Sequence, residues 1–294
     1  MFLVAAGFFQ SIFKLVVWRP DVVFTKGGYV CLPVGVAAYF LRIPIVVHDS
    51  DAYPGLTNRI LGKWASAIAT GAPLEHYNYP KDISRYVGIP IGSEYHKFSD
   101  QEQTDAKKKW GITTRKPLLV VTGGGLGASR INDAVVFSLD ELLKLVSVVL
   151  ISGAGQYEDL LSKIPENHKE LQLYPFISDN FASLLGAADL VIARAGATTI
   201  LELAALEKPT IIIPNAKLTG GHQLKNAEVY KKKNAAVVLD EDEMIENPKL
   251  IIEVVNQVIS DNQKTKKMTR IFASFARPNA AKDVAEMIIA STKK

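Results

Sequence analysis

Short apolar runs alternate with stretches of helical periodicity along most of this chain. Each run ends in glycine or polar residues, which is typical of buried strands in a parallel sheet. Strands that alternate with helices form parallel sheets covered by helices, and the pattern occurs twice, so we expect an α/β fold with two doubly wound sheets. The predicted strands are residues 21–25, 43–47, 67–70, 85–87, 118–122, 146–152, 172–175, 189–193, 209–214 and 235–239, with 67–70 and 85–87 as edge strands.

The segments between these runs carry apolar residues at helical spacing. They predict helices at 30–41, from 54 through 64, and at 100–110, 180–187, 199–205, 223–233, 248–260 and 280–292. After Gly92 the sequence becomes polar and charged as far as Lys116, which is typical of a linker. We therefore place one domain at 1–98 and a second at 99–294, with the last helix either in the second domain or returning to the first.

The first eighteen residues are strongly apolar but carry Gln10 and Lys14. They have no basic leading region and no cleavage pattern, so they indicate neither a signal peptide nor a full membrane span. A buried or half-buried helix is favoured, and a helix lying on a membrane interface is the alternative. Because a domain of this class opens on a strand, we expect a segment upstream to be missing.

Composition narrows the class of protein. The chain has 294 residues, of which 48% are hydrophobic, enough for two cores. Its single cysteine, Cys31, excludes a disulfide framework and a thiolate zinc site, so a reducing compartment is expected. The net charge of +4 is mildly basic, and the lysine clusters indicate solvated helix faces rather than a nucleic-acid surface.

Residues 118–132 read LLVVTGGGLGASRIN and predict a strand, a tight loop and a helix. Glycines permit close backbone approach, and the N–H groups and positive dipole of a helix start attract phosphate. The spacing matches neither the dinucleotide fingerprint nor a Walker loop. By itself the loop is therefore either a phosphate site, through Gly124, Gly125 and Gly127, or only a tight strand-to-helix connection.

A second loop of this kind precedes the predicted helix at 199–205. Gly196 gives it backbone freedom, and either Thr198 or Thr199 supplies a hydroxyl and a cap at the helix start. Glu202 is the only charge among apolar neighbours, which favours a binding role over a solvated carboxylate. Further along, His222 and Asn226 share one helical face, and capping is an equally good reading of His222 and Gln223.

Four polar residues, His48 to Asp51, follow the predicted strand at 43–47. The carboxyl ends of parallel strands are where ligands bind, and His48, Asp49 or Asp51 has the chemistry of a general base or of a group that orients one. A histidine and an acid after a strand are also often structural.

Five segments together resemble the MurG family of glycosyltransferases. From about Pro20 onward they are DVVFTKGGYVCLPVGVAA, HDSDAYPGLTNR, VTGGGLGASRIN, ADLVIARAGATTILELAALEKPTIIIP and GGHQLKNA. The resemblance implies the GT-B fold, in which two Rossmann-like domains face a cleft. It implies inverting transfer of N-acetylglucosamine from UDP-N-acetylglucosamine to lipid I (undecaprenyl-pyrophosphoryl-N-acetylmuramoyl-pentapeptide), which forms lipid II in peptidoglycan biosynthesis. Family members open with a strand and a Gly-Gly-Thr-Gly-Gly-His loop that this sequence lacks, so the N-terminal domain is expected to be incomplete.

The resemblance also assigns roles to residues. His48 and Asp49 are the catalytic candidates, and no metal or cofactor is implied. The acceptor side comprises Gly27, Gly28, Tyr29, Asp51 and Asn58. The donor side comprises Gly124, Gly125, Gly127, Ile177, Gly196, Thr198, Glu202, His222, Gln223 and Asn226.

The implied partners are a UDP-sugar, an undecaprenyl-linked acceptor and the cytoplasmic face of the bacterial cell membrane, where the protein is peripheral. The missing N-terminal segment is expected either upstream of Met1, which would then be an internal methionine, or on a further chain that acts as a partner. Two alternatives stay open: a UDP-sugar-binding subunit or fragment that is inactive alone, and another GT-B enzyme such as a UDP-sugar 2-epimerase or a glycolipid synthase.

Overall fold

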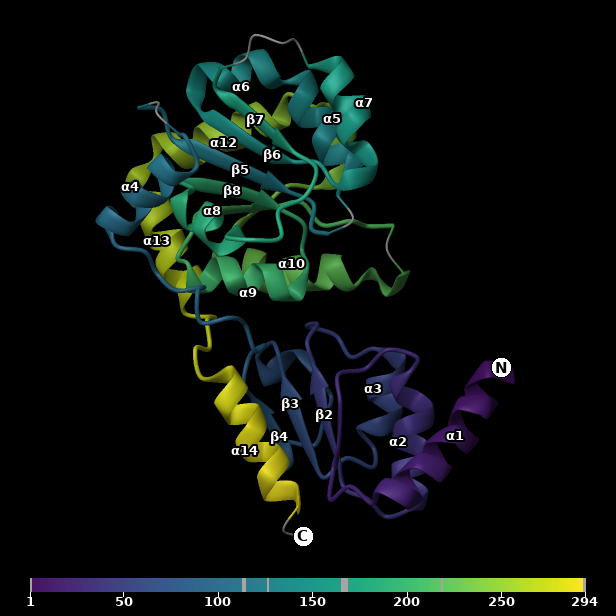
Figure 1. Cartoon of the computed structure of the whole chain (residues 1–294). Coiled ribbons are helices and arrows are strands. Elements are labelled where there is room, and N and C mark those ends of the chain that lie inside the picture. The colour runs from purple at the N-terminus through teal and green to yellow at the C-terminus, as the bar shows by residue number, and fades with distance from the viewer. Residues whose placement is uncertain (1, 113–114, 126, 165–168, 218, 293–294) are drawn as a thin grey trace. The chain divides into compact units, whose positions relative to one another are not determined.

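The computed structural model describes residues 2–112, 115–125, 127–164, 169–217 and 219–292 of the chain. The chain divides into two compact units (Figure 1). The first comprises Met1–Ile91 and Arg277–Lys294, and the second comprises Gly92–Ala276. The polypeptide therefore passes from one unit to the other twice.

The first unit is built on a four-stranded parallel sheet with strand order β1-β2-β3-β4. Because β3 pairs with both β2 and β4, the prediction that residues 67–70 form an edge strand was wrong. The elements are α1 (Phe2–Trp18), β1 (Val23–Thr25), α2 (Cys31–Phe40), β2 (Ile45–Asp49), α3 (Leu56–Leu61), β3 (Ala67–Thr70), η1 (Leu74–His76), β4 (Ser84–Tyr86) and α14 (Ala280–Thr292).

Helices cover this sheet on both faces. Small residues in α2 allow close packing, since a Cβ added to Gly35 would lie 2.5 Å from the Leu61 side chain. On the other face α14 packs on β3, where Val284 joins Ala69 and Val87 in a small apolar cluster. The last helix of the chain thus completes the core of the first unit.

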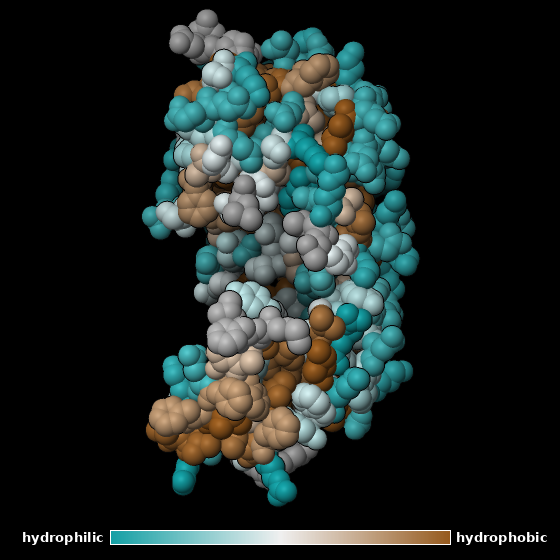
Figure 2. Space-filling view, turned by 90° about the vertical axis from the view of Figure 1, so that its right-hand side faces the viewer, coloured by the Kyte–Doolittle hydropathy of each residue, from teal (hydrophilic) through white to brown (hydrophobic). Residues whose placement is uncertain are grey.

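Helix α1 is half-buried, as one of the two readings of its sequence predicted. Leu15 is buried in the core of the unit, and Phe8 and Ile12 pack against that core. The opposite face is exposed: Phe9 and Phe13 are 70% and 71% accessible. Figure 2 shows this surface as a continuous apolar area of the first unit. Exposed apolar side chains on α1 and α2 include Phe9, Phe13, Val16, Val17, Trp18, Tyr39 and Phe40.

The second unit is built on a six-stranded parallel sheet with strand order β10-β9-β8-β5-β6-β7. Its elements are α4 (Asp100–Lys109), β5 (Leu118–Thr122), α5 (Ser129–Phe137), α6 (Leu139–Leu145), β6 (Ser147–Ile151), η2 (Ala154–Gln156), α7 (Tyr157–Lys163), β7 (Leu171–Tyr174), α8 (Phe181–Ala187), β8 (Leu190–Ala193), α9 (Ala197–Ala205), β9 (Thr210–Ile212), η3 (Thr219–Gly221), α10 (His222–Lys232), β10 (Val237–Val238), α11 (Glu241–Glu246), α12 (Leu250–Ser260) and α13 (Asn262–Ala273).

Strand order reverses at β5. The chain runs outward from β5 through β6 to β7, then returns to the other side of β5 with β8 and continues to β9 and β10. The crevice outside the carboxyl ends of β5 and β8 is therefore the topological switch point, where open α/β sheets bind ligands.

The central strands are buried on both faces, which explains why their sequences are continuous apolar runs. The sequence pattern missed α6, α7, α11 and α13. Helix α13 is polar over most of its length, and its packing depends on single residues such as Phe272, which is fully buried. Tertiary contacts rather than periodicity therefore define this helix.

No helix within the described ranges has both the length and the apolar character needed to cross a bilayer.

Candidate functional site

The glycine loop after β5 has the geometry of a tight turn. Gly124 and Gly127 have φ angles of 80° and 74°, in the left-handed region that favours glycine. A Cβ on Gly127 would lie 2.2 Å from the carbonyl oxygen of Ser152, and one on Gly123 would lie 2.4 Å from the amide nitrogen of Ala128. Glycine is thus required at these positions by conformation and by space.

One side of the same loop is open. A Cβ added to Gly124 or Gly125 would meet no atom within 4 Å, so the backbone there is accessible to a ligand. Leu126, which lies inside the loop, is outside the described residues. Helix α5 starts at Ser129, immediately after the loop, and its first N–H groups have no intrahelical partners. This combination is suited to a phosphate group.

The second loop follows β8, the neighbour of β5 in the sheet. Thr122 and Ala193 are partners in the register, so the two strands end side by side. Gly196 precedes the first residue of α9 with extended backbone angles, and Thr198 is exposed in the first turn. Two helix starts therefore lie on neighbouring strand ends at the switch point, an arrangement that can neutralise a diphosphate.

Glu202 lies in α9 and is half-buried. Its carboxylate accepts a hydrogen bond from the hydroxyl of Tyr95. Burial raises the pKa of Glu202, the Tyr95 hydrogen bond opposes the rise, and the charge of Glu94 adds to it. Burial, followed by the neighbouring carboxylates, raises the pKa of Tyr95 to about 12. The Glu202 carboxylate is therefore not simply solvated, because it is half-buried and hydrogen-bonded to the Tyr95 hydroxyl.

Tyr95 was missed by sequence reasoning. It belongs to the irregular segment before α4, and no local pattern links it to a residue a hundred positions away. Only the fold brings the two side chains together.

Helix α10 carries three of the residues predicted to bind the sugar-nucleotide donor. The side chains of two of them hydrogen-bond to backbone atoms. The Oε1 atom of Gln223 accepts a 2.9 Å hydrogen bond from the amide of Asn215. Asn226 is buried and donates from Nδ2 to the carbonyl oxygen of Ala195, at 3.1 Å. Asn226 therefore braces the loop that precedes α9. His222 begins the helix directly after two glycines with positive φ.

Ile177 lies between β7 and α8, outside any strand, and is half-buried. Its neighbour Phe176 is 57% exposed. The predicted strand at 172–175 ends in the structure at Tyr174, so the backbone of Ile177 forms no part of the sheet.

A buried ion-pair network lies behind the glycine loop. Glu241 is 1% exposed and contacts two guanidinium groups: Nη2 of Arg194 at 2.5 Å and Nη1 of Arg130 at 2.7 Å. Arg194 also donates to the carbonyl oxygen of Ile213, at 3.2 Å. Arg130, Arg194 and Glu241 line a cavity of about 250 Å³ that Gly127 also borders. The network ties the ends of β8 and β9 to α5 and α11.

In the first unit, β2 extends through Asp49, two residues beyond the predicted strand end. His48 and Asp49 are therefore strand residues and point to opposite faces of the sheet. His48 is fully buried, with Nε2 2.8 Å from the carbonyl oxygen of Gly88 and Nδ1 3.2 Å from Oγ of Ser50. Burial lowers the pKa of His48. In this structure His48 braces the strand end, and its catalytic role stays a prediction.

Asp49 lies on the other face. Its Oδ2 accepts a 2.7 Å hydrogen bond from the hydroxyl of Tyr79, and Asn58 also hydrogen-bonds to the carboxylate. Burial raises the pKa of Asp49 to about 6, against the opposing effect of these two hydrogen bonds, while Asp51 adds to the rise. A carboxylate with this pKa is a stronger base than an ordinary aspartate and is still ionised at neutral pH.

Several predicted acceptor-side residues come together here. A Cβ on Gly27 would lie 2.9 Å from Nδ2 of Asn58, so the glycine permits the Asn58 amide to approach the turn after β1. Gly28 has open space beside it, and Tyr29 is 80% exposed. Asp51 uses its carbonyl oxygen to accept a 2.6 Å hydrogen bond from Tyr77.

Among the described residues, no group of three or more His, Cys, Asp and Glu side chains is arranged to hold a metal ion.

Comparison with known proteins identifies similar families. The model of the glycosyltransferase family 28 C-terminal domain matches residues 118–284, and the model of the N-terminal domain of that family matches residues 1–70. A protein of Clostridium kluyveri is 36% identical over 258 residues, which are 87% of this chain and 70% of the relative. A protein of Acetivibrio thermocellus is 36% identical over 276 residues, which are 92% of this chain and 73% of the relative. Both are named as N-acetylglucosamine transferases for UDP-N-acetylglucosamine and N-acetylmuramyl-(pentapeptide) pyrophosphoryl-undecaprenol.

Solved structures give a consistent result. The crystal structure of Acinetobacter baumannii MurG superposes with a TM-score of 0.78 at 25% identity, covering 98% of this chain and 79% of that one. UDP-GlcNAc 2-epimerase from Neisseria meningitidis, bound to UDP-GlcNAc, has a TM-score of 0.70 at 14% identity, with coverage of 98% and 81%. The second likeness concerns the fold alone.

Proposed function

This chain belongs to glycosyltransferase family 28, in its MurG group, and on that premise we propose that it transfers N-acetylglucosamine from UDP-N-acetylglucosamine to lipid I. The product is lipid II, so the reaction is a step of peptidoglycan biosynthesis. The predicted GT-B class, with two parallel-sheet α/β units, is confirmed by the family domains and the MurG structure.

One observation carries the donor half of the proposal. Two loops that end in helix starts lie on the neighbouring strands β5 and β8, at the switch point of the second sheet. We assign the diphosphate of the donor to these loops, through the backbone of Gly124, Gly125 and Gly127 and the first turn of α9. As UDP leaves, negative charge grows on the diphosphate, and the two helix starts stabilise it with no metal required.

The remaining donor contacts follow from the residues around these loops. The Glu202 carboxylate is assigned to the ribose hydroxyls, which replace the Tyr95 hydroxyl as its hydrogen-bond donors. The backbone near Ile177 is assigned to the uracil edge. His222 and Gln223, at the start of α10, are assigned to the sugar, while Asn226 positions the loop before α9.

On the acceptor side we assign the general base to Asp49. It takes the proton of the acceptor hydroxyl as the oxygen of that hydroxyl attacks the anomeric carbon and the bond to UDP breaks. Burial supports this role by giving Asp49 a pKa of about 6. Asn58 and Tyr79 orient the carboxylate, and the turn at Gly27 and Gly28 borders it.

We further propose that the protein rests on the membrane surface through α1. Its acceptor is lipid-linked, and α1 exposes Phe9, Phe13 and Val17 at helical spacing, with Lys14 on the same helix. An amphipathic helix with apolar and basic side chains lies in the interface plane.

The test is transfer of labelled N-acetylglucosamine from UDP-N-acetylglucosamine to a soluble lipid I analogue, with UDP-glucose as competing donor. Formation of labelled lipid II together with UDP supports the proposal. Interconversion of the sugar without acceptor would indicate an epimerase, and binding of the donor without turnover would indicate a subunit that acts only with a partner. Either of the last two results overturns the proposal.

A further inference from the structure

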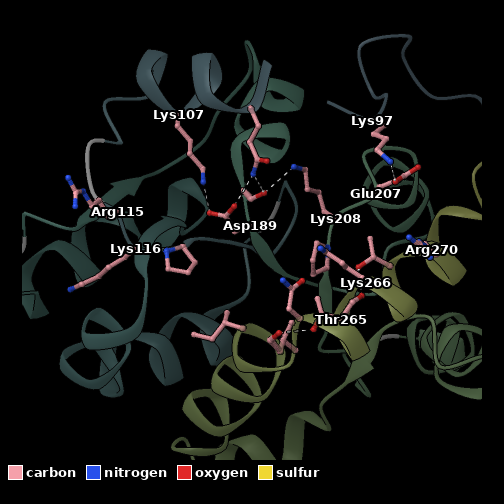
Figure 3. A pocket seen from close by; sticks show the side chains of 18 residues that line it. Lys97, Lys107, Arg115, Lys116, Asp189, Glu207, Lys208, Thr265, Lys266 and Arg270 are labelled. Atoms are coloured by element: carbon pink, nitrogen blue, oxygen red, sulfur yellow. Dashed lines mark hydrogen bonds and ion pairs between the residues drawn. The ribbon is translucent and has the colours of Figure 1, made fainter. Parts of the chain in front are cut away.

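The second unit contains a basic pocket that the proposed reaction does not use (Figure 3). Its volume is about 710 Å³, within the range of small-molecule sites. Seven of the side chains that line it are basic, and two are acidic. The basic ones are Lys97, Lys107, Arg115, Lys116, Lys208, Lys266 and Arg270, and the acidic ones are Asp189 and Glu207.

The pocket lies at the amino ends of the central strands. Pro117, Asp189 and Pro209 border it, and each directly precedes a strand: β5, β8 and β9. The two proposed diphosphate loops follow the carboxyl ends of β5 and β8. With five residues in β5 at a rise of about 3.3 Å each, the two edges are roughly 15 Å apart. The pocket is therefore a separate site.

One face of α13 forms a wall of the pocket. Lys266 and Arg270 are one turn apart and point to the same side, and Thr265 and Thr269 flank them. Lys264 and Lys267, on the same helix, are exposed and do not line the pocket. The helix thus separates its basic residues into a pocket face and a solvent face.

Three of the basic side chains are neutralised by the protein. Lys107 pairs with Asp189 at 2.6 Å, and Lys97 pairs with Glu207 at 2.7 Å. Lys116 pairs with Glu170, at 2.6 Å.

Arg115, Lys266 and Arg270 have no anionic partner in the part of the chain that the structure describes. These three cations are therefore available to pair with a bound anion.

Lys208 adds a buried cation. Its side chain comes from the turn between α9 and β9 and is 6% exposed. The ammonium donates to the carbonyl oxygens of Gly186, at 2.6 Å, and Ala188, at 3.0 Å. Burial lowers the pKa of Lys208 to about 8, an effect that Asp189 opposes and Lys107 reinforces. Figure 3 shows Lys208 near Asp189, among the side chains that line the pocket.

We propose that this pocket binds a multiply charged phosphate anion, in addition to the diphosphate of the donor. Arginine matches phosphate oxygens with a planar fork of donors, and lysines act beside it as point charges. The walls present both types, from the segment before β5, from the α9–β9 turn and from α13. The proposal does not depend on the assigned reaction, because none of its residues takes part in it.

The test is calorimetric titration of the whole chain with inorganic pyrophosphate, in the presence of saturating UDP. The wild type is compared with Lys266→Gln/Arg270→Gln and with Lys264→Gln/Lys267→Gln. Both double variants remove two positive charges from exposed positions of α13, so the second is a matched control for net charge.

Pyrophosphate is expected to bind the wild type and the control alike, and the pocket variant roughly tenfold or more weakly, since charge-assisted hydrogen bonds to phosphate are lost. Glycerol 3-phosphate titrated in parallel identifies the source: tighter binding than pyrophosphate indicates a lipid headgroup, and weaker binding indicates a soluble polyphosphate. Absence of pyrophosphate binding, or equal affinity in all three proteins, overturns the proposal.

Discussion

The hydroxyl of Tyr79 donates a 2.7 Å hydrogen bond to Oδ2 of Asp49, the carboxylate assigned as general base. Tyr79 lies thirty residues beyond Asp49, in the segment between η1 and β4. The hydrogen bond lowers the pKa of Asp49, whereas burial raises it, and the balance leaves that pKa at about 6. Tyr79 thus lowers the pH at which the base becomes protonated, against the larger effect of burial.

This balance predicts the pH profile of the enzyme. Transfer should fall as the pH drops through about 6, because Asp49 becomes protonated and no longer accepts a proton. In Tyr79→Phe the opposing hydrogen bond is gone, so the pKa of Asp49 rises and the acidic limb of kcat against pH moves to higher pH. Asp49→Asn should abolish transfer and keep donor binding. An acidic limb that stays in place in Tyr79→Phe would remove Asp49 from the role of base.

Replacement of Glu202 by alanine should weaken UDP binding by about 1 to 3 kcal/mol, because ribose hydroxyls lose their acceptor. Tyr95→Phe provides the contrast, since it removes the internal donor of Glu202 and leaves the carboxylate in place. Its affinity for UDP should equal or exceed that of the wild type. Calorimetric titration of UDP measures both. If Glu202→Ala binds UDP as the wild type does, Glu202 only holds Tyr95.

Two glycines of the same loop should respond differently to alanine. Gly127→Ala places a Cβ 2.2 Å from the carbonyl oxygen of Ser152, at a φ of 74°. We expect a loss of about 1 to 3 kcal/mol in the free energy of unfolding, together with weaker UDP binding. Gly125→Ala meets no atom within 4 Å and should leave stability unchanged. Urea denaturation measures the free energy of unfolding of the two variants. Equal values would show that the backbone around Gly127 has room for a Cβ.

Glu241→Gln should be strongly destabilising. It removes the buried charge that compensates the guanidinium of Arg194, and breaking such a pair costs about 3 to 5 kcal/mol. Arg130→Gln should cost less, because its side chain is 31% exposed and water can replace it. The midpoints of urea unfolding measure both. A similar small loss in the two variants would mean that the network is solvated.

Much of the second unit was predictable from its sequence, because fully buried parallel strands appear as unbroken apolar runs. The runs at 118–122 and 189–193 placed both loops correctly. The strand at 43–47 was ended too early, since His48 and Asp49 are polar although both are buried in β2. Hydrogen bonds to groups far along the chain stabilise these buried side chains. The periodicity of the sequence does not reveal such bonds.

The same limit applies to the side chains that complete the sites. Tyr79 and Tyr95 come from irregular segments, and Glu241 comes from the start of α11, a helix that the pattern missed. Each meets its partner only through long-range packing. Sequence motifs identify the residues in loops that follow strands. The residues that orient those side chains can be identified only from contacts in the three-dimensional structure.

Because the chain enters and leaves the second unit once each, a single cut between Ile91 and Gly92 would not free the first unit as a complete fragment. Residues 1–91 would stay joined to α14 by noncovalent contacts: the ion pair between Arg85 and Asp283 at 3.0 Å, and the apolar cluster around Val284. A nicked protein should therefore migrate as one species under native conditions and as two in denaturant. The first unit expressed without its last eighteen residues would lack a wall of its own core.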